Sequence, residues 1–342
     1  MRWLVGRRWL LTRRILVTGA TGFFGRHLIP SLVAREYSVR VATRRFVSFG
    51  DAVEVIQIDD LIHDIDWPRY VDGLDVVVHL AALAHMNTKT SESDYKAINA
   101  RATVRLARAA GEAGARFIFM SSIAAQTGPS STEVLTESTQ ALPTTPYGRS
   151  KLRAEQEIAL MTNKYVILRP TLTYGYGVKG NMGRIIRLAL LKFAPPFGLL
   201  HNKRSLLAIE NMCEAVNFVQ NSDLALKQVF ILSDPEPVSV AEIIHLLRSG
   251  AGLNGEGLHI SPAVLSMGLR ALGRRELWMK MGENLVTSVA KLQGIGFSWK
   301  TSSSEGLRNL GARYAIVGST KSGKPFGSVV QESSINERSA PI

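Results

Sequence analysis

The chain has 342 residues, 46% of them hydrophobic and 20% charged, as in an ordinary globular protein, and its length predicts about two lobes. The one cysteine, Cys213, excludes an internal disulfide, and the lack of an apolar run of about 18 residues excludes a membrane-spanning helix, so we expect a cytoplasmic protein. The net charge of +13 suits anionic partners, but the basic residues are scattered beyond the N-terminus, so we expect no nucleic-acid partner.

The N-terminus is rich in arginine. Five arginines crowd its first fourteen residues: Arg2, Arg7, Arg8, Arg13 and Arg14. We interpret residues 1–13 as a basic, aromatic extension, because the apolar stretch that a twin-arginine export signal needs would run into the first strand and the glycine loop after it. Contact of this extension with a membrane surface is the alternative.

Short β-branched runs alternate with helical patterns up to Pro170, which predicts a parallel sheet wrapped by helices. Strands are expected at Arg14–Thr18, Ser38–Ala42, Val53–Gln57, Leu74–Leu80, Phe117–Met120 and Tyr165–Leu168, and helices at Phe24–Ala34, Asp94–Ala113 and around Tyr147. Six strands in this order predict an α/β fold with a Rossmann-type doubly wound sheet, which we place at residues 14–170.

The alternation ends after residue 170. Helices are expected at Asn181–Lys192, Ile209–Gln220, Val240–Ser249 and Pro262–Leu272. We interpret residues 171–310 as a smaller C-terminal lobe that binds the substrate. From Gly311 the composition becomes small and polar, which predicts a disordered tail at residues 311–342.

The first predicted strand leads into Thr18-Gly19-Ala20-Thr21-Gly22-Phe23-Phe24-Gly25, and a helix follows. In this setting a glycine motif binds the phosphates of a dinucleotide: Gly19 makes the turn tight, Gly22 admits the pyrophosphate, and Gly25 lets the helix pack on the strand. A purely structural glycine turn is the alternative.

The end of the second strand selects the cofactor. An acid there would bind the ribose of NAD, but this chain has Arg44 and Arg45, which suit the 2′-phosphate of NADP. We therefore favour NADP(H), with NAD(H) possible. The alternative for the arginines is a solvated loop. Asp59 follows the third strand, where a short acid meets the adenine or caps a loop.

A catalytic pair is expected at Tyr147 and Lys151, since residues four apart share one face of a helix. The ammonium group would hold the phenol near its anionic form, so that it exchanges protons with an alcohol or ketone. Ser122, at the end of the fifth strand, would hydrogen-bond the reacting oxygen, although a serine there can simply form a turn. Asn99 would support a proton path or bond a backbone carbonyl.

No metal site is expected, because the seven histidines do not combine with a nearby acid in a metal-binding pattern. His79 lies in an apolar strand, which favours a hydrogen-bonded core residue over a ligand.

These motifs together resemble the extended short-chain dehydrogenase/reductase superfamily, and within it the nucleotide-sugar epimerase/dehydratase group. The resemblance runs from Arg14 to Leu310 and is carried by the glycine motif, His79-Leu80-Ala81-Ala82, Ser121-Ser122, Tyr147 with Lys151, Leu168-Arg169-Pro170 and Tyr174-Gly175. It implies a homodimer and a dinucleotide site that includes Phe23, Phe24, Leu80, Ala81, Ala82 and Lys151.

Tyr174 to Asn181 and Asn202 to Leu207 further resemble the UDP-glucose 4-epimerase-like branch. That branch contains 4-ketoreductases that form UDP-N-acetylquinovosamine for surface polysaccharides. The resemblance implies that Asn181 and Arg204 contact the diphosphate of a UDP-sugar; an ordinary surface arginine is the alternative for Arg204.

The arginines after the second strand favour a reductase that acts on C4 of a UDP-4-keto-6-deoxy-N-acetylhexosamine. A UDP-sugar 4-epimerase is the first alternative, because the same residues would serve both reactions, and a non-catalytic dinucleotide-binding protein is the second. Two departures weaken the choice of substrate. The segment after Ser122 lacks the Val-Tyr-Gly of epimerases, and Leu285 to Lys291 lacks an aspartate common in this branch.

Overall fold

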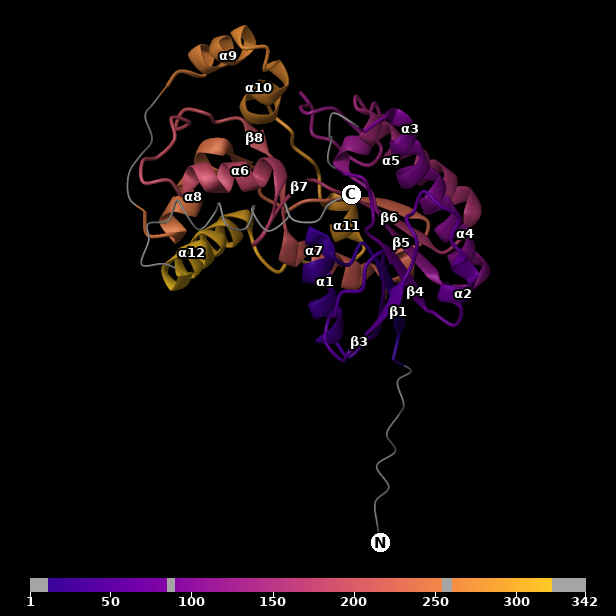
Figure 1. The fold of residues 1–342 in the computed structure, drawn as a ribbon. Helices are drawn as coiled ribbons and strands as arrows, with labels where there is room; N and C mark the ends of the chain where they lie inside the picture. The colour runs from indigo at the N-terminus through magenta and orange to yellow at the C-terminus, as the bar shows by residue number, and fades with distance from the viewer. Residues whose placement is uncertain (1–11, 85–89, 254–259, 322–342) are drawn as a thin grey trace. The chain divides into compact units, whose positions relative to one another are not determined.

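The structure is a computed structural model that describes residues 12–84, 90–253 and 260–321 (Figure 1). Most of the predicted N-terminal extension and residues 322–342 of the predicted tail lie outside the described residues. Among the helices of the described part, none is long and apolar enough to cross a membrane.

The chain divides into two compact units that interleave along the sequence. The first unit comprises Met1–Ser121, Arg149–Leu168 and Val216–Val229; the second comprises Ser122–Gly148, Arg169–Ala215 and Phe230–Ile342. The predicted boundary after residue 170 lies next to one of these crossings, between Leu168 and Arg169. The sequence did not predict the other points at which the chain passes from one unit to the other.

A seven-stranded sheet confirms the predicted Rossmann-type α/β fold. Its order is β10-β6-β5-β4-β1-β2-β3. The strands are β1 (Arg14–Thr18), β2 (Ser38–Thr43), β3 (Val53–Gln57), β4 (Val76–His79), β5 (Arg116–Met120), β6 (Tyr165–Pro170) and β10 (Gln228–Leu232). The pairs from β3 to β6 are parallel. All six predicted strands are present, and β10 is the one the sequence analysis missed.

The helices along the first part of the chain are α1 (Phe23–Val33), α2 (Trp67–Val71), α3 (Glu92–Tyr95), α4 (Thr103–Glu112) and α5 (Pro146–Met161). Between α3 and α4 the helix continues as the π-helical segment η1 (Lys96–Ala102), so the single predicted helix at residues 94–113 has a wider turn in its middle. Short 3₁₀ turns form η2 (Ile123–Ala125) and η3 (Asp223–Ala225).

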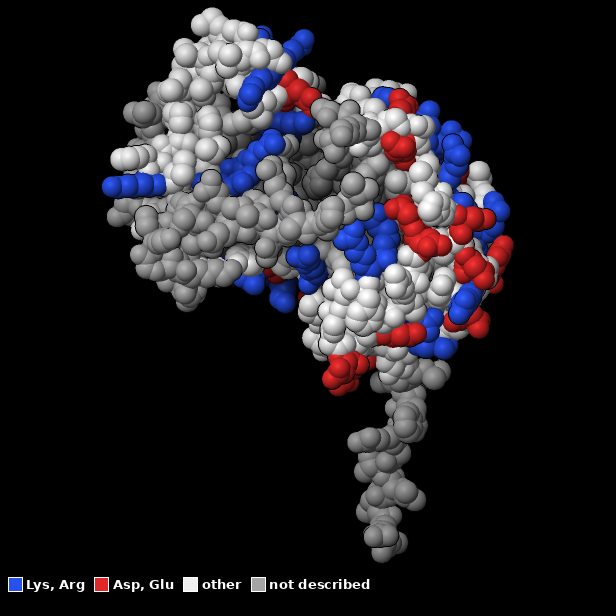
Figure 2. Space-filling view, in the orientation of Figure 1, with Lys and Arg blue, Asp and Glu red and all other residues white. Residues whose placement is uncertain are grey.

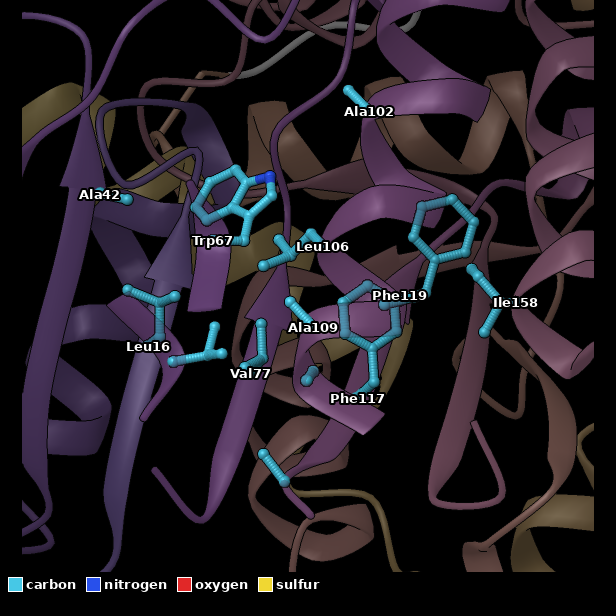
Figure 3. Packing of buried hydrophobic residues seen from close by; sticks show 14 of the residues in the cluster. Leu16, Ala42, Trp67, Val77, Ala102, Leu106, Ala109, Phe117, Phe119 and Ile158 are labelled. Atoms are coloured by element: carbon cyan, nitrogen blue, oxygen red, sulfur yellow. The ribbon is translucent and has the colours of Figure 1, made fainter. Parts of the chain in front are cut away.

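A large apolar core forms between one face of the sheet and helices α2, α4 and α5 (Figure 3). Phe117 and Phe119 of β5 pack there with Leu106 of α4 and Ile158 of α5, and Trp67 covers the α2 side. Aromatic rings of this size each bury a large apolar area. The core fixes the carboxyl ends of β1, β4 and β5 at one edge of the sheet.

The second unit has two small sheets: β7 (Leu172–Tyr174) pairs with β9 (Leu206–Ala208), and β8 (Lys203–Arg204) pairs with β11 (Val238–Ser239). Its later helices are α6 (Gly180–Ala189), α8 (Val240–Gly250), α9 (Pro262–Ala271), α10 (Arg275–Gly282), α11 (Ala290–Gly294) and α12 (Ser303–Lys321), and α7 (Ile209–Val219) runs across the unit boundary. The four helices predicted for this part are present with ends shifted by up to three residues.

Helix α12 corrects the predicted start of the tail. We expected disorder from Gly311, but the helix continues to Lys321. Leu307 and Leu310 are buried in the core of the second unit, and a Cβ on Gly311 would overlap the backbone of Leu247 in α8. Close packing between the two helices stabilises a segment whose composition alone does not favour a helix.

Asp234 is the polar centre of the second unit. Its buried carboxylate accepts hydrogen bonds from the Tyr174 hydroxyl at 3.0 Å, Asn211 Nδ2 at 2.7 Å, Ser303 Oγ at 3.1 Å and the backbone N–H of Ala208 at 3.0 Å. These bonds tie β7, β9, α7 and α12 to one side chain. Burial, followed by the Asp234 charge, raises the pKa of Tyr174 far above its ordinary value, so the phenol stays protonated.

Candidate active site

The glycine turn has the geometry expected for close approach to a ligand. Gly19 has a φ of +73°, and a Cβ there would lie 2.6 Å from the backbone nitrogen of Ala81. A Cβ on Gly25 would lie 2.6 Å from the Cα of Ala20, so a side chain there would push α1 away from the end of β1. Both observations agree with the tasks predicted for these two glycines.

A cavity of about 290 Å³ opens in front of this turn, within the first unit. Its walls are the β1–α1 turn, the residues after β2 and β3, and the segment after β4. Six predicted cofactor residues line it: Gly19, Gly22, Arg44, Leu80, Ala81 and Ala82. Phe23, Phe24, Gly25 and Arg45 are not part of its lining.

The acid at this cavity is Asp60 rather than the predicted Asp59. Asp59 is exposed, whereas the Asp60 carboxylate lies 2.6 Å from Nη1 of Arg44. Burial would raise the pKa of Asp60, but the hydrogen bonds from Arg44 and from the Ile62 backbone hold it below its ordinary value. The prediction was displaced by one residue because the sequence did not define where the chain turns after β3.

The cavity fits the phosphate-bearing part of a dinucleotide. The space beside Gly19 is one that a Cβ would fill, and the N-terminus of α1 points its backbone N–H groups and dipole toward an anion. The first turn of α1 contains no acidic residue that would repel a phosphate. Gly19, Gly22 and Arg44 would hold the cofactor here.

His79 links three elements beneath the cavity. Its Nδ1 lies 2.7 Å from Thr18 Oγ1 at the end of β1, and its Nε2 lies 2.9 Å from Thr103 Oγ1 at the start of α4. Burial, assisted by the charge of Lys151, lowers the pKa of His79 to about 3, so the ring is neutral. His79 is therefore a core residue with two hydrogen-bond partners, as predicted.

Asn99 braces the segment that lines the cavity. It lies in the π-helical turn η1 and is fully buried. Its Oδ1 accepts the N–H of Leu83 at 2.8 Å, and its Nδ2 donates to the Leu83 carbonyl at 3.0 Å and to Ser150 Oγ at 3.2 Å. Of the two predicted readings, these bonds support the backbone contact, and a proton path through Asn99 stays a prediction.

Lys151 lies buried against the end of β5. Its Nζ donates to the Met120 carbonyl at 2.8 Å and sits 4.4 Å from the centre of the Phe119 ring. Burial lowers the pKa of Lys151 to about 7, and the carboxylate of Glu155 acts in the opposite direction. An ammonium group with a pKa near neutrality can respond to a change of charge beside it.

The two serines after β5 have different partners. The hydroxyl of Ser121 donates to the carboxylate of Glu155, and Ser121 is buried. Ser122 accepts a hydrogen bond from the N–H of Ala124 at 3.1 Å, which leaves its own hydroxyl hydrogen available to donate. This difference favours Ser122, as predicted, for a hydrogen bond to a substrate oxygen.

Tyr147 lies near the turn that Ser122 begins, within the second unit. A Cβ on Gly148 would overlap the carbonyl oxygen of Ala124 in η2, so the first turn of α5 packs directly on that turn. The Tyr147 side chain is half-buried. One turn further along α5, Lys151 completes the Tyr-x-x-x-Lys motif.

The predicted substrate residues differ in environment. Asn181 is exposed near the start of α6. Arg204 is buried and donates to the backbone carbonyls of Glu283 at 2.9 Å, Pro129 at 3.0 Å and Met279 at 3.4 Å. Burial lowers its pKa to about 10. Arg204 is thus not a surface arginine, and its contact with a diphosphate stays a prediction.

Glu155, Asp60 and Gly148 are the residues around these positions that the sequence analysis missed. Glu155 follows Lys151 by four residues, a spacing that places both side chains on one helix face. That signal was readable, since Tyr147, Lys151 and Glu155 repeat at intervals of four. Gly148 had no signal beyond its place beside the tyrosine.

Comparison with known proteins places these features in context. Residues 15–230 match the NAD dependent epimerase/dehydratase family. The chain is 36% identical over 251 residues to a UDP-glucose 4-epimerase of Vibrio cholerae, covering 69% of this chain and 75% of that protein. It is 32% identical over 177 residues to a ceramide reductase of Caulobacter vibrioides, covering 49% of each chain.

A solved structure of MoeE5 in complex with UDP-glucuronic acid and NAD has a similar fold. The TM-score is 0.69 at 25% sequence identity, and the superposition covers 87% of this chain and 97% of that one.

Proposed function

We propose, from the premise that this chain belongs to the NAD-dependent epimerase/dehydratase family, that it reduces C4 of a UDP-4-keto-6-deoxy-N-acetylhexosamine with NADPH. The family confirms the resemblance read from the sequence and the predicted class of NAD-dependent nucleotide-sugar enzyme. The specific sugar and the preference for NADPH are the proposal. A cytoplasmic location, assembly as a homodimer and synthesis of surface polysaccharide remain predictions.

The observation that carries the choice of reductase is Arg44 in the wall of the cofactor cavity. No acidic residue occupies the end of β2, where the chain reads Ala42-Thr43-Arg44. A guanidinium group suits the 2′-phosphate of NADP, whereas the ribose 2′-hydroxyl of NAD is ordinarily bound by an acidic residue at this position. Arg44 now pairs with Asp60, and a phosphate would compete for the same donors.

The bound dinucleotide supplies the hydride that reduces the carbonyl carbon. Tyr147 donates its phenolic proton to the oxygen of the forming alcohol. Lys151 stabilises the tyrosinate left behind, because a cation nearby favours the anionic form of a phenol. Ser122 donates a hydrogen bond that orients the substrate oxygen toward Tyr147, and Glu155 keeps a negative charge beside Lys151.

UDP-sugar 4-epimerisation is the second candidate. The relative from Vibrio cholerae is named a UDP-glucose 4-epimerase, and MoeE5 was solved with a UDP-sugar and NAD. In that reaction the same residues would first remove the proton from the C4 hydroxyl and later return it. Asn181 and Arg204 would hold the diphosphate in either case.

The deciding experiment compares the two reactions directly. The purified protein is incubated with a UDP-4-keto-6-deoxy-N-acetylhexosamine and NADPH, and in parallel with UDP-glucose alone. We expect stoichiometric oxidation of NADPH in the first mixture and no conversion in the second, because a reductase must exchange its cofactor at each turnover. Protein that retains NAD through purification and converts UDP-glucose to UDP-galactose without added cofactor would establish the epimerase instead.

Removing the positive charges after β2 tests the cofactor assignment. Replacing Arg44 and Arg45 together by Gln should raise the Michaelis constant for NADPH about tenfold or more, as expected for losing one or two charge-assisted hydrogen bonds. The constant for NADH should hardly change. Arg35→Gln, an exposed arginine of the same unit that does not line the cavity, serves as the control. An equal rise of the Michaelis constants for NADPH and NADH would show that Arg44 and Arg45 contribute only general surface charge.

A further inference from the structure

Helix α9 carries apolar residues on two opposite faces. Leu265 and Leu269 pack against the core of the second unit. Val264 and Met267, which point the other way around the helix, are 55% and 68% exposed, and α9 contains no buried residue. A surface helix ordinarily presents polar residues to water on its outer face. The outer face of α9 therefore suits a partner that accepts apolar side chains.

Positive charge borders this apolar face. Leu272, 73% exposed, ends the apolar stretch, and Arg270, Arg274 and Arg275 are exposed beside it. Residues 261–282 contain four basic residues and one acidic residue, a net charge of +3. The acidic residue, Glu276, forms an i,i+4 pair with Lys280 at 2.5 Å, so the net charge comes from the three arginines.

We propose that α9 and the turn after it form a docking surface for an anionic lipid bilayer. An interfacial helix of this kind lies in the plane of the membrane, with apolar side chains among the acyl chains and basic side chains at the headgroups. Val264, Met267 and Leu272 would enter the bilayer, and Arg270, Arg274 and Arg275 would meet anionic headgroups. The inference is independent of the reaction proposed above.

Two features favour a bilayer over other occupants. A second copy of the chain that docked through this face about a twofold axis would set three arginines against three arginines. A peptide partner would need a groove, whereas these exposed apolar residues belong to helix α9, which lies at the margin of the second unit (Figure 1). Figure 2 shows this region as mostly uncharged surface, with basic groups and an acidic group beside it.

The test measures binding of the full chain to vesicles by sedimentation. Vesicles of equimolar phosphatidylglycerol and phosphatidylcholine are compared with vesicles of phosphatidylcholine alone, at low and high salt. We expect binding to the anionic vesicles that weakens as salt increases. Replacing Arg270, Arg274 and Arg275 by Gln should lower the partition coefficient roughly 100-fold, about fivefold for each charge. Replacing Val264 and Met267 by Ser should lower it about tenfold.

Matched variants separate this surface from general charge and apolarity. The double variant Leu224→Ser, Ile316→Ser removes apolar side chains that are 69% and 64% exposed elsewhere. The triple variant Arg35→Gln, Arg69→Gln, Arg308→Gln removes three exposed charges that do not belong to the α9 surface. Both controls should bind vesicles within about twofold of the parent, because they leave the interfacial face intact.

Three results would overturn the proposal. The first is no binding to anionic vesicles. The second is binding that the α9 variants do not weaken, which would assign it to another basic region such as the N-terminal arginines. The third is a change of molecular mass by light scattering on replacing Val264 and Met267, without a change in vesicle binding, which would make the face a contact between copies of the chain.

Discussion

Two buried polar centres, one in each unit, carry charges of opposite sign. In the second unit burial, followed by the charge of its hydrogen-bond partner Asp234, raises the pKa of Tyr174 and keeps the phenol protonated. In α5 the basic residue one turn after Tyr147 is Lys151, whose own pKa burial lowers to about 7. A neighbouring anion disfavours the tyrosinate and a neighbouring cation favours it, so these two charges would act on a phenol in opposite directions.

The two centres also differ in how their charge is compensated. Asp234 accepts four hydrogen bonds that join separate elements, an arrangement that stabilises the fold. Lys151 donates to one backbone carbonyl and has a carboxylate nearby. A buried charge with many fixed partners serves stability, whereas a buried charge with few partners can change protonation state with its surroundings.

The largest expected effect separates the two tyrosines. Tyr147→Phe should lower turnover by about 100-fold or more while dinucleotide still binds, because general acid catalysis contributes roughly 10²–10⁴-fold. Tyr174→Phe is the matched control: it should leave turnover near that of the parent and reduce the free energy of unfolding by about 1–2 kcal/mol. Turnover and urea unfolding of both variants check this. Near-normal turnover of Tyr147→Phe would remove the basis of the proposed site.

Asp234→Ala should destabilise the second unit by about 3 kcal/mol, because it leaves several buried donors without an acceptor. Asp234→Asn retains one acceptor oxygen and should lose about half as much. Thermal and urea unfolding measure both. If the alanine variant unfolds like the parent, the four hydrogen bonds do not hold the elements together as described.

His79 predicts how stability depends on pH. Its folded pKa of about 3 lies below the ordinary value of 6.5, so below pH 6.5 the unfolded chain binds a proton that the folded chain does not. Stability should therefore be complete above pH 6.5 and fall by about 1.4 kcal/mol per pH unit from this residue as the pH decreases toward 3. His79→Gln should flatten the profile between pH 6.5 and 5, measured by urea unfolding at each pH. An unchanged slope would assign the acid sensitivity to other groups.

The smallest effect concerns Glu155. Because its charge raises the pKa of Lys151, Glu155→Gln should lower that pKa further and move the alkaline limb of kcat/KM toward lower pH. Glu157→Gln on the same helix, where the carboxylate pairs with Arg153, is the control and should leave the limb in place. If the two variants give the same profile, Glu155 serves folding alone through Ser121.

Most of the sheet was readable from the sequence because its strands are short, apolar and β-branched. Strands β1 and β3 have the predicted ends. Strand β10 was missed because it lies in the part of the chain where we expected only helices, and its pairing with β6 is a contact between residues far apart in the chain. The π-helical turn at Asn99 could not be predicted either. A single π-helical turn shifts the spacing of the buried apolar residues by only one residue, which the sequence pattern of an ordinary helix does not reveal.

The parts of the site that belong to sequence motifs were predictable. Gly19, Gly25 and His79 have the environments that the sequence analysis expected, whereas the acid after β3 was displaced by one residue from Asp59 to Asp60. Motifs locate a backbone turn well but do not define where a loop side chain points. The carbonyls that surround Arg204 come from two separate segments, one at Pro129 and one at the end of α10, and no local pattern in the chain predicts these contacts.

The contact between Gly148 and Ala124 limits which residues position 148 can accept. An added methyl group at position 148 would overlap the Ala124 carbonyl, so even alanine would push the first turn of α5 away from η2. The residue beside the tyrosine is thereby closed to every side chain, although it has no chemistry of its own. In a saturation library of α5 we expect position 148 to accept no replacement among active clones, while exposed Arg149 next to it accepts many.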